Sequence, residues 1–229
     1  MGLCETSRMA QTWAVVPMFN EGTVIASVVS ELRKSIPHVV CVDDCSSDDS
    51  VAQAQSAGAI VVRHPINLGQ GASLQTGFEF AREIPEMTEI VTFDADGQHQ
   101  VADALEMVQR LRDEDLDIVI GSRFLDNRTD MSRLKRGVLR LATGYTRMTT
   151  GMELTDAHNG LRVISRDLLM KLKIKQNRMA HASELIDQVR LHEAKWAEHP
   201  THIVYTDYSR GKGQSVLNSV NILVEIIFK

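Results

Sequence analysis

The chain has 229 residues, which is enough for one α/β domain with a full hydrophobic core. With 43% hydrophobic and 24% charged residues, its composition is that of an ordinary globular protein. The formal net charge of −5 argues against non-specific binding of nucleic acid, which needs a basic field. An acidic protein that holds an anionic substrate would need a metal ion or a few well-placed arginines.

Short apolar runs alternate with stretches of helical periodicity through the first half of the chain. The apolar runs predict strands over residues 13–17, 39–43, 60–62, 90–94 and 117–121. Helices are predicted from about residue 69 and over residues 24–36, 47–57 and 101–112. Repeated strand–helix units of this kind predict an α/β fold with a mostly parallel, Rossmann-like central sheet and helices on both faces.

The second half of the chain is less regular. Its periodicity predicts helices over residues 131–150 and 183–194, and strands over residues 161–164 and 203–206. Residues 216–229 are predicted to form a C-terminal amphipathic helix, whose apolar stripe faces the core, docks on a membrane partner or lies at a bilayer surface. Because no repeat or linker interrupts the chain, we expect one domain over residues 1–229.

Three cysteines, Cys4, Cys41 and Cys45, lack the spacing of a metal knuckle, and we expect them to be reduced thiols. No segment is apolar over the length needed to cross a bilayer, and residues 1–12 lack the apolar core of a signal peptide. We therefore expect a cytoplasmic protein, or one that is peripheral on the cytosolic face of a membrane. Residues 1–11 are expected to be a flexible N-terminus.

Polar residues follow three predicted strands at their C-terminal ends: Asn20 and Glu21, Asp43 and Asp44, and Asp94 and Asp96. In an open α/β sheet, ligands bind in the crevice at this edge. Carboxylates delivered by three strands would repel one another unless a cation or hydrogen-bond donors lay between them.

Asp94 and Asp96 give the sharpest local signal. Positions two apart on a strand face the same way, so both carboxylates could point into one site. Two carboxylates suit Mg²⁺ or Mn²⁺, which also binds phosphate oxygens and offsets the charge of a diphosphate leaving group. The alternative is a polar strand end that caps the next helix. His99 is either a third metal ligand or an exposed loop residue.

Two further segments of the first half could contact a ligand. Asp44 is assigned to hydrogen bonds with a nucleobase or ribose, and residues 47–49 mainly to the start of a helix. Gly69 lies in a glycine-bearing turn that could bring its backbone close to a ligand. A plain helix N-terminus is the simpler interpretation of that turn.

Four candidates lie in the second half. Arg123, at a strand end, forms either a surface ion pair or a phosphate or sugar contact. Asp156 could act as a general base, accept a hydrogen bond from a sugar hydroxyl, or form an Asx-turn. Arg210 and Lys212 lie in a basic loop that could close over a diphosphate, with a solvated surface loop as the alternative. Glu184 is interpreted as an exposed helical glutamate.

Six short motifs follow one another along the chain: PMFNE at 17–21, DDCS at 43–46, NLGQG at 67–71, DADGQH at 94–99, GSR at 121–123 and NGLR at 159–162. In this order they resemble family 2 glycosyltransferases, in the branch of dolichol-phosphate mannose synthases and polyprenyl-phosphate glycosyltransferases. The resemblance covers about residues 13–215. It implies a GT-A fold and an inverting, single-displacement transfer from a nucleotide-diphosphate sugar.

The resemblance also implies roles for individual residues. Gln98 matches a donor-pocket position, Asp156 an acidic position proposed as the base, and Arg210 an arginine of a mobile acceptor loop. A metal–diphosphate centre would lie between Asp94 and Asp96. The nucleotide pocket would be lined by Pro17, Asn20, Glu21 and Asp44.

Several residues depart from the branch pattern. Gly97 stands where these enzymes usually carry leucine, and Asn159 and Leu161 replace the usual residues around the following glycine and arginine. These departures concern the acceptor more than the donor chemistry. If the acceptor is a lipid, a separate membrane protein is an expected partner, and a homo-oligomer is a further alternative.

The predicted function is transfer of a hexose, with inversion, from a UDP- or GDP-linked sugar to a polyprenyl phosphate or a glycan hydroxyl in cell-surface polysaccharide or glycolipid synthesis. A phosphomonoester, whose second pKa is about 6, needs little general base, whereas a hydroxyl would need one, with Asp156 as the best candidate. The alternatives are a catalytically silent nucleotide-sugar-binding subunit and a sugar nucleotidyltransferase. The latter would normally carry a glycine-rich, arginine-containing loop after the first strand, where this chain has PMFNE.

Overall fold

A computed structural model describes residues 11–126 and 133–204. Arg210, Lys212 and the expected C-terminal helix over 216–229 lie outside these residues.

In the part of the chain that the structure describes, seven strands form one sheet: β1 Thr12–Met18, β2 His38–Asp43, β3 Ile60–Arg63, β4 Glu89–Thr92, β5 Ile118–Ser122, β6 Arg162–Ser165 and β7 Trp196–Pro200. Their spatial order is β3-β2-β1-β4-β6-β5-β7. β6 runs antiparallel to β4 and β5, and the other neighbouring strands are parallel. The predicted α/β architecture with a mostly parallel sheet is therefore confirmed.

β1 lies inside the sheet because all seven of its residues can be buried. It pairs with β2 on one side and β4 on the other. Trp13 and Val15 point into one hydrophobic core, and Ala14 and Val16 point into the other. Both faces of the strand are therefore covered, as expected for a parallel sheet between helical layers.

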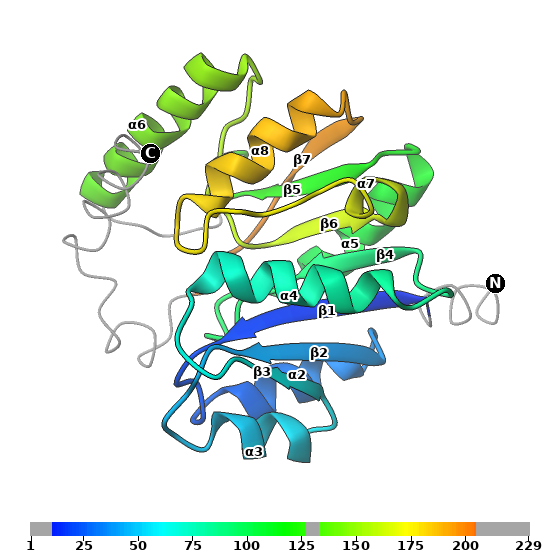
Figure 1. Ribbon diagram of the computed structural model, residues 1–229. Coiled ribbons are helices and arrows are strands. Elements are labelled where there is room, and N and C mark those ends of the chain that lie inside the picture. The colour runs from blue at the N-terminus through cyan, green and yellow to red at the C-terminus, as the bar shows by residue number, and fades with distance from the viewer. Residues whose placement is uncertain (1–10, 127–132, 205–229) are drawn as a thin grey trace.

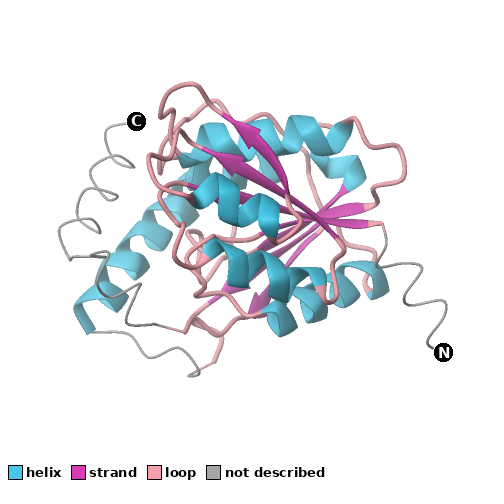
Figure 2. Cartoon of the chain, turned by 90° about the horizontal axis from the view of Figure 1, so that it is seen from below, coloured by secondary structure: helices cyan, strands magenta, loops and turns pink. Residues whose placement is uncertain are grey.

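Helices cover both faces of the twisted sheet (Figures 1 and 2). The core that contains Trp13 is covered by α4 Gln70–Arg82, α7 Arg166–Leu169 and α8 His181–Leu191. The opposite core is covered by α2 Ile25–Arg33, α3 Ser50–Ser56 and α5 Val101–Asp113. The long helix α6 Arg133–Thr150 packs against α8. Among the helices of residues 11–126 and 133–204, none has the length and apolar character needed to span a membrane.

Residues 203 and 204 of the expected strand over 203–206 have no regular structure, and residues 205 and 206 lie outside the described residues. The last described strand is β7, and residues 201–204 follow it without regular structure. Among the described residues, β7 pairs with β5 alone, at the edge of the sheet, and all five of its residues are half-buried. Because an edge strand of this kind needs no apolar run, hydrophobic periodicity did not detect it.

The topology brings several chain segments together at one end of the sheet, which we call the carboxyl edge. β1, β2, β4, β5 and β7 end there, and the antiparallel β6 begins there. α6 follows β5 and stands at this end of the molecule (Figure 1). Residues that are far apart in the sequence can therefore share one site at the carboxyl edge.

Candidate active site

Asp94 and Asp96 lie in a turn beyond β4, which ends at Thr92. The N–H of Phe93 still donates to the carbonyl of Val15 at 3.0 Å, after which the chain leaves the sheet. Gly97 has a φ of 73°, in the left-handed region that glycine tolerates best. The expectation that strand alternation aligns the two carboxylates was therefore wrong, because a turn positions them.

Asp94 packs against the loop that leads into β6. A Cβ atom at Gly160 would lie 2.3 Å from Oδ2 of Asp94, so this approach requires glycine. Nε2 of His99 lies 2.9 Å from the same oxygen, and Nε2 of Gln70 donates to Oδ1 at 3.2 Å. Burial acts to raise the pKa of Asp94, but His99 and Arg162 outweigh it, and the pKa falls below its usual value.

His99 fits neither of the expected alternatives. It is buried, its ring meets Phe93 edge-on at a centroid distance of 5.4 Å, and its Nε2 contacts Asp94. We therefore assign His99 to holding the Asp94 carboxylate in place.

Asp96 lies close to other carboxylates. Burial and the negative charge of Asp94 raise its pKa to about 6, and Glu21 adds to this effect. Its Oδ1 accepts a hydrogen bond of 3.1 Å from the N–H of Gln98, whose side chain is also buried. A divalent cation near Asp94 and Asp96 would offset this repulsion.

The donor set fits a metal that arrives with its substrate. Within residues 11–126 and 133–204, no group of three or more histidine, cysteine, aspartate or glutamate side chains could hold a metal ion by itself. Mg²⁺ is typically bound by one or two carboxylates together with substrate phosphates and water. Asp94 and Asp96 would supply the carboxylates of such a site.

Asp44 shapes a neighbouring loop. Its carboxylate accepts hydrogen bonds from the N–H groups of Leu68 at 2.8 Å and Gly69 at 2.7 Å, and it lies 2.9 Å from Nδ1 of His64. The side chain is almost fully buried. Asp44 therefore fixes the start of α4 beside the carboxyl edge.

The segment after β1 is also held by its own polar groups. Asn20 has a φ of 54°; its N–H donates to Oγ of Ser46 at 2.8 Å, and its Oδ1 accepts from the N–H of Ser47 at 2.9 Å. The N–H of Glu21 donates to a serine hydroxyl at the start of α3. Pro17 is buried within β1. These contacts join the loops after β1 and β2 into one wall of the edge.

The N-terminus of α4 is covered by protein. The carbonyl of Asn177 accepts hydrogen bonds from the N–H groups of Gly71 at 2.8 Å and Ala72 at 3.2 Å. Gly69 has a φ of 106°, and a Cβ atom there would lie 2.4 Å from the same carbonyl. Glu184 is half-buried and accepts from two backbone N–H groups just before Asn177, so its interpretation as an exposed residue was wrong. Packing alone thus explains the glycines of this turn.

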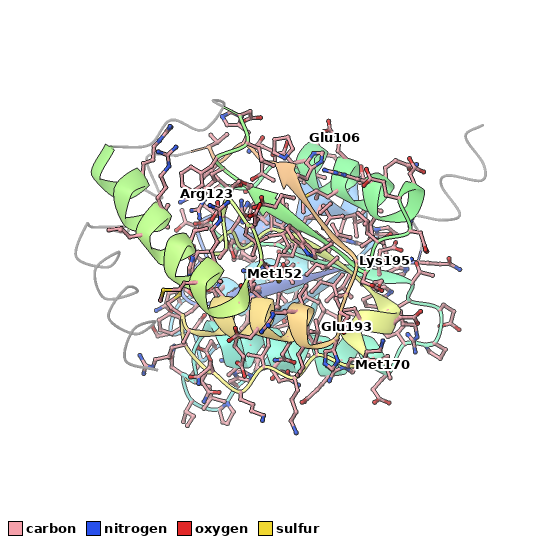
Figure 3. All side chains as sticks on the ribbon, turned by 90° about the horizontal axis from the view of Figure 1, so that it is seen from above. Glu106, Arg123, Met152, Met170, Glu193 and Lys195 are labelled. Carbon is pink, nitrogen blue, oxygen red and sulfur yellow. The ribbon has the colours of Figure 1, made fainter. Side chains whose placement is uncertain are left out.

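Arg123 and Asp156 form a bidentate ion pair. Nε of Arg123 lies 2.6 Å from Oδ2 of Asp156, and Nη2 lies 2.7 Å from Oδ1. Asp156 is fully buried, and although burial acts to raise its pKa, Arg123 outweighs this and lowers it. In Figure 3, Arg123 lies near α6, at the opposite end of the sheet from Lys195.

This pairing changes the interpretation of both residues. Arg123 forms an ion pair, as one alternative held, but a buried one. Asp156 has neither the exposure nor the raised pKa that suit a general base. Its N–H is held in turn by Glu198 of β7, which accepts from the N–H groups of Thr155 and Asp156 at 2.8 and 2.9 Å.

A buried cationic cluster next to Asp94 was missed by the sequence reasoning. Arg162 is 1% exposed, and its Nε has no hydrogen-bond partner among the described residues. Burial lowers the pKa of Arg162 to about 10. Burial likewise lowers the pKa of the neighbouring His158 and His181 to about 4 each. At neutral pH the cluster therefore carries the single charge of Arg162.

One signal could have identified Arg162. It is a charged residue inside the apolar strand pattern of residues 161–164, at a position whose side chain faces the core beneath α4 and α8. A buried cation with an unused donor costs free energy unless a ligand or counter-ion satisfies it. Arg162 is therefore a strong candidate to contact an anionic or hydroxyl group of a substrate.

Comparison with known proteins identifies the family of this chain. A family model described as glycosyl transferase family 2 matches residues 13–173. The chain is 34% identical over 224 residues to an uncharacterized protein of Methanocaldococcus jannaschii, a match that covers 96% of this chain and 92% of that protein. It is 26% identical over 237 residues to the UDP-N-acetylglucosamine–dolichyl-phosphate N-acetylglucosaminyltransferase of Methanococcus voltae, covering 94% of each chain.

A solved structure supports the same fold. Glucosyl-3-phosphoglycerate synthase from Mycobacterium tuberculosis, in complex with Mg²⁺ and uridine diphosphate, matches with a TM-score of 0.69 at 19% identity, over 96% of this chain and 83% of that chain. The α/β sheet described above is therefore of the GT-A type. The chain belongs to glycosyl transferase family 2, and it is a glycosyltransferase.

Proposed function

We propose that this enzyme transfers a hexose from a nucleotide-diphosphate sugar to a polyprenyl phosphate, with inversion at the anomeric carbon. The observation that carries the choice of acceptor is the buried ion pair between Arg123 and Asp156. A hydroxyl acceptor would need a general base. Asp156, the expected base, is unsuited to that role when it is buried and paired with Arg123. A phosphomonoester is largely a dianion at neutral pH, since its second pKa is about 6, and it can attack without a base.

The relatives support the same acceptor. The named relative of Methanococcus voltae, which this chain matches over 94% of both lengths, acts on dolichyl phosphate. Relatives from two other organisms are named for dodecaprenyl phosphate and undecaprenyl phosphate.

In the proposed reaction, an oxygen of the acceptor phosphate attacks the anomeric carbon while the bond from that carbon to the diphosphate breaks. The nucleoside diphosphate leaves with the bonding electron pair. Asp94 and Asp96 would hold Mg²⁺ or Mn²⁺, which when bound offsets the charge of the leaving diphosphate. Arg162 would donate to a substrate oxygen from beneath the same edge.

The remaining candidates have positioning roles in this proposal. Arg210 and Lys212 would close over the diphosphate. Gln98 would line the donor pocket beside Asp96. The nucleotide would lie against the wall formed by the loops after β1 and β2 and the start of α4, which contain Pro17, Asn20, Glu21, Asp44 and Gly69. Either UDP or GDP would fit a wall of backbone and carboxylate groups.

Transfer can be tested with the purified full chain, Mn²⁺ and radiolabelled UDP- and GDP-sugars. Each donor is offered with undecaprenyl phosphate, with dolichyl phosphate, or with a soluble glycan acceptor. We expect label to enter the organic phase with a polyprenyl phosphate only. Label transferred only to the soluble glycan would overturn the acceptor assignment and restore the need for a base.

Two further measurements test the mechanism. Proton NMR of the product should show a β-linked sugar when the donor is α-linked, and an α-linked product would rule out a single displacement. The pH dependence of kcat/KM should follow the second ionisation of the acceptor phosphate, whose pKa is about 6.

A further inference from the structure

α6 carries a charge that sets it apart from the rest of the chain. Its sequence, RLKRGVLRLATGYTRMTT, contains five basic residues and no acidic residue. The chain as a whole has a net charge of −5, so the remainder is more negative still. Such local asymmetry attracts an anionic surface to this helix and repels it elsewhere.

The described side chains of α6 separate into an inner and an outer face. The inner face packs toward α8 and consists of Leu139, Thr143, Thr146 and Thr150, all buried. The outer face carries large apolar side chains, with Leu141 69% exposed and Met148 77% exposed. This arrangement reverses that of an ordinary surface helix, whose apolar residues face the core.

The outer face has two adjacent stripes. Gly137, Leu141, Gly144 and Met148 have the spacing of a single helical stripe, and a Cβ atom added at either glycine would meet nothing within 4 Å. A second stripe runs along one side and contains Arg136, Arg140 and Arg147. Within residues 11–126 and 133–204, none of the three arginines forms an ion pair.

The position of α6 relates this face to the candidate active site. The helix lies between Arg123 and Asp156 in the sequence, and these two residues meet in an ion pair at the carboxyl edge. The guanidinium of Arg140 also lies 5.7 Å from the ring centre of Phe124, which directly follows Arg123. A surface that binds the outer face of α6 would therefore lie beside the edge where substrates bind (Figures 1 and 3).

We propose that the outer face of α6 docks the enzyme on an anionic lipid bilayer. Arg136, Arg140 and Arg147 would contact lipid phosphates, while Leu141 and Met148 enter the boundary between headgroups and acyl chains. A second copy of the chain is a poorer occupant, because a symmetric contact would bring like-charged arginine stripes together. The role of docking in catalysis rests on the proposed polyprenyl-phosphate acceptor, whereas binding to lipid does not.

Docking is tested by sedimentation of the full chain with vesicles of phosphatidylcholine alone or mixed equally with phosphatidylglycerol. We expect binding to the mixed vesicles only, weakened by added salt. Each basic residue near an anionic surface contributes a factor of about five, so Arg136→Gln, Arg140→Gln and Arg147→Gln together should weaken binding roughly a hundredfold.

A matched control removes three exposed cations elsewhere: Lys171→Gln, Lys173→Gln and Arg190→Gln. These residues lie on or near α7 and at the end of α8, and the control should retain most of the binding. Equal loss in both triple variants, equal binding to both vesicle types, or no binding by the unmodified protein would overturn the proposal.

Activity separates docking from catalysis. With a short-chain polyprenyl phosphate in detergent, the α6 variant should keep its activity, and with the same acceptor in mixed vesicles it should lose it. Loss in detergent as well would assign the arginines to the active site and overturn docking. Vesicle binding by a protein that glycosylates no polyprenyl phosphate would leave docking intact and refute the proposed function. If the α6 variant differed from the unmodified protein in sedimentation coefficient but not in vesicle binding, the outer face would be a contact with a second copy, and docking would be overturned.

Discussion

Replacing Arg162 by methionine should make the protein more stable and less active. Arg162 is 1% exposed, and its Nε has no partner among the described residues, so its charge is poorly compensated in the free enzyme. Methionine fills much of the same space without a charge. Residues that bind substrate are often retained at such a cost in stability.

The size of the effect follows from the pKa. Burial lowers the pKa of Arg162 from 12.5 to about 10, and each pKa unit corresponds to about 1.4 kcal/mol. Keeping the guanidinium charged therefore costs the folded state about 3 kcal/mol at neutral pH. This cost declines only as the pH rises above about 10. Because Asp94 loses a cationic neighbour in the variant, we expect a net gain of about 1–3 kcal/mol.

Such a gain would raise Tm by about 2–12 °C for a chain of this length. Loss of a charge-assisted hydrogen bond to substrate should lower kcat/KM about 10- to 100-fold. The assays are thermal unfolding without ligands and sugar transfer to undecaprenyl phosphate under the same conditions.

Arg166→Met is the matched control, four residues further along. Arg166 donates to the carbonyls of Ile84 and Met87, so this variant should lose stability and keep its activity. If Arg162→Met were destabilised and retained normal kcat/KM, Arg162 would be a structural residue and the reasoning would fail.

Three other predictions concern residues in or around the candidate site. Without metal, Asp96 favours the folded state below its unfolded pKa of 3.8, and this contribution is lost as the pH rises through about 6. Asp96→Asn should therefore raise Tm at neutral pH. In the unmodified protein, the stabilisation by Mn²⁺ with UDP should weaken below about pH 6, and thermal-shift measurements check both results. Glu198→Ala should lower the free energy of unfolding by about 2–4 kcal/mol in urea, since two backbone N–H groups lose a half-buried, charged acceptor, whereas Glu114→Ala, in an exposed pair, should change it by under about 0.5 kcal/mol. Gly71→Ala should cost about 1–3 kcal/mol or more, because its Cβ would lie 2.0 Å from a carbonyl oxygen, whereas Gly144→Ala, in open space on α6, should stabilise by about 0.5–1 kcal/mol.

Local patterns in the sequence predict the fold class and the edge of the sheet at which the candidate site lies. Apolar runs and helical periodicity are local signals, so they located β1, β2 and α5 to within about two residues. Motifs at strand ends then predicted the carboxyl edge, because parallel strands end on the same side of a sheet. Six motifs in order also predicted the glycosyltransferase family that the comparisons show.

The contacts between polar groups, by contrast, depend on how the strands are arranged in the sheet. β6 enters between β4 and β5 in the opposite direction, and this places Arg162 beside Asp94. Asp156 meets Arg123 across 33 residues of sequence, and Glu198 of the undetected strand β7 reaches across another 42 to hold its N–H. Local pattern records the preference of each residue for water or for the core. Pairing of buried charges depends on which strands become neighbours, and that is settled only when the sheet is assembled.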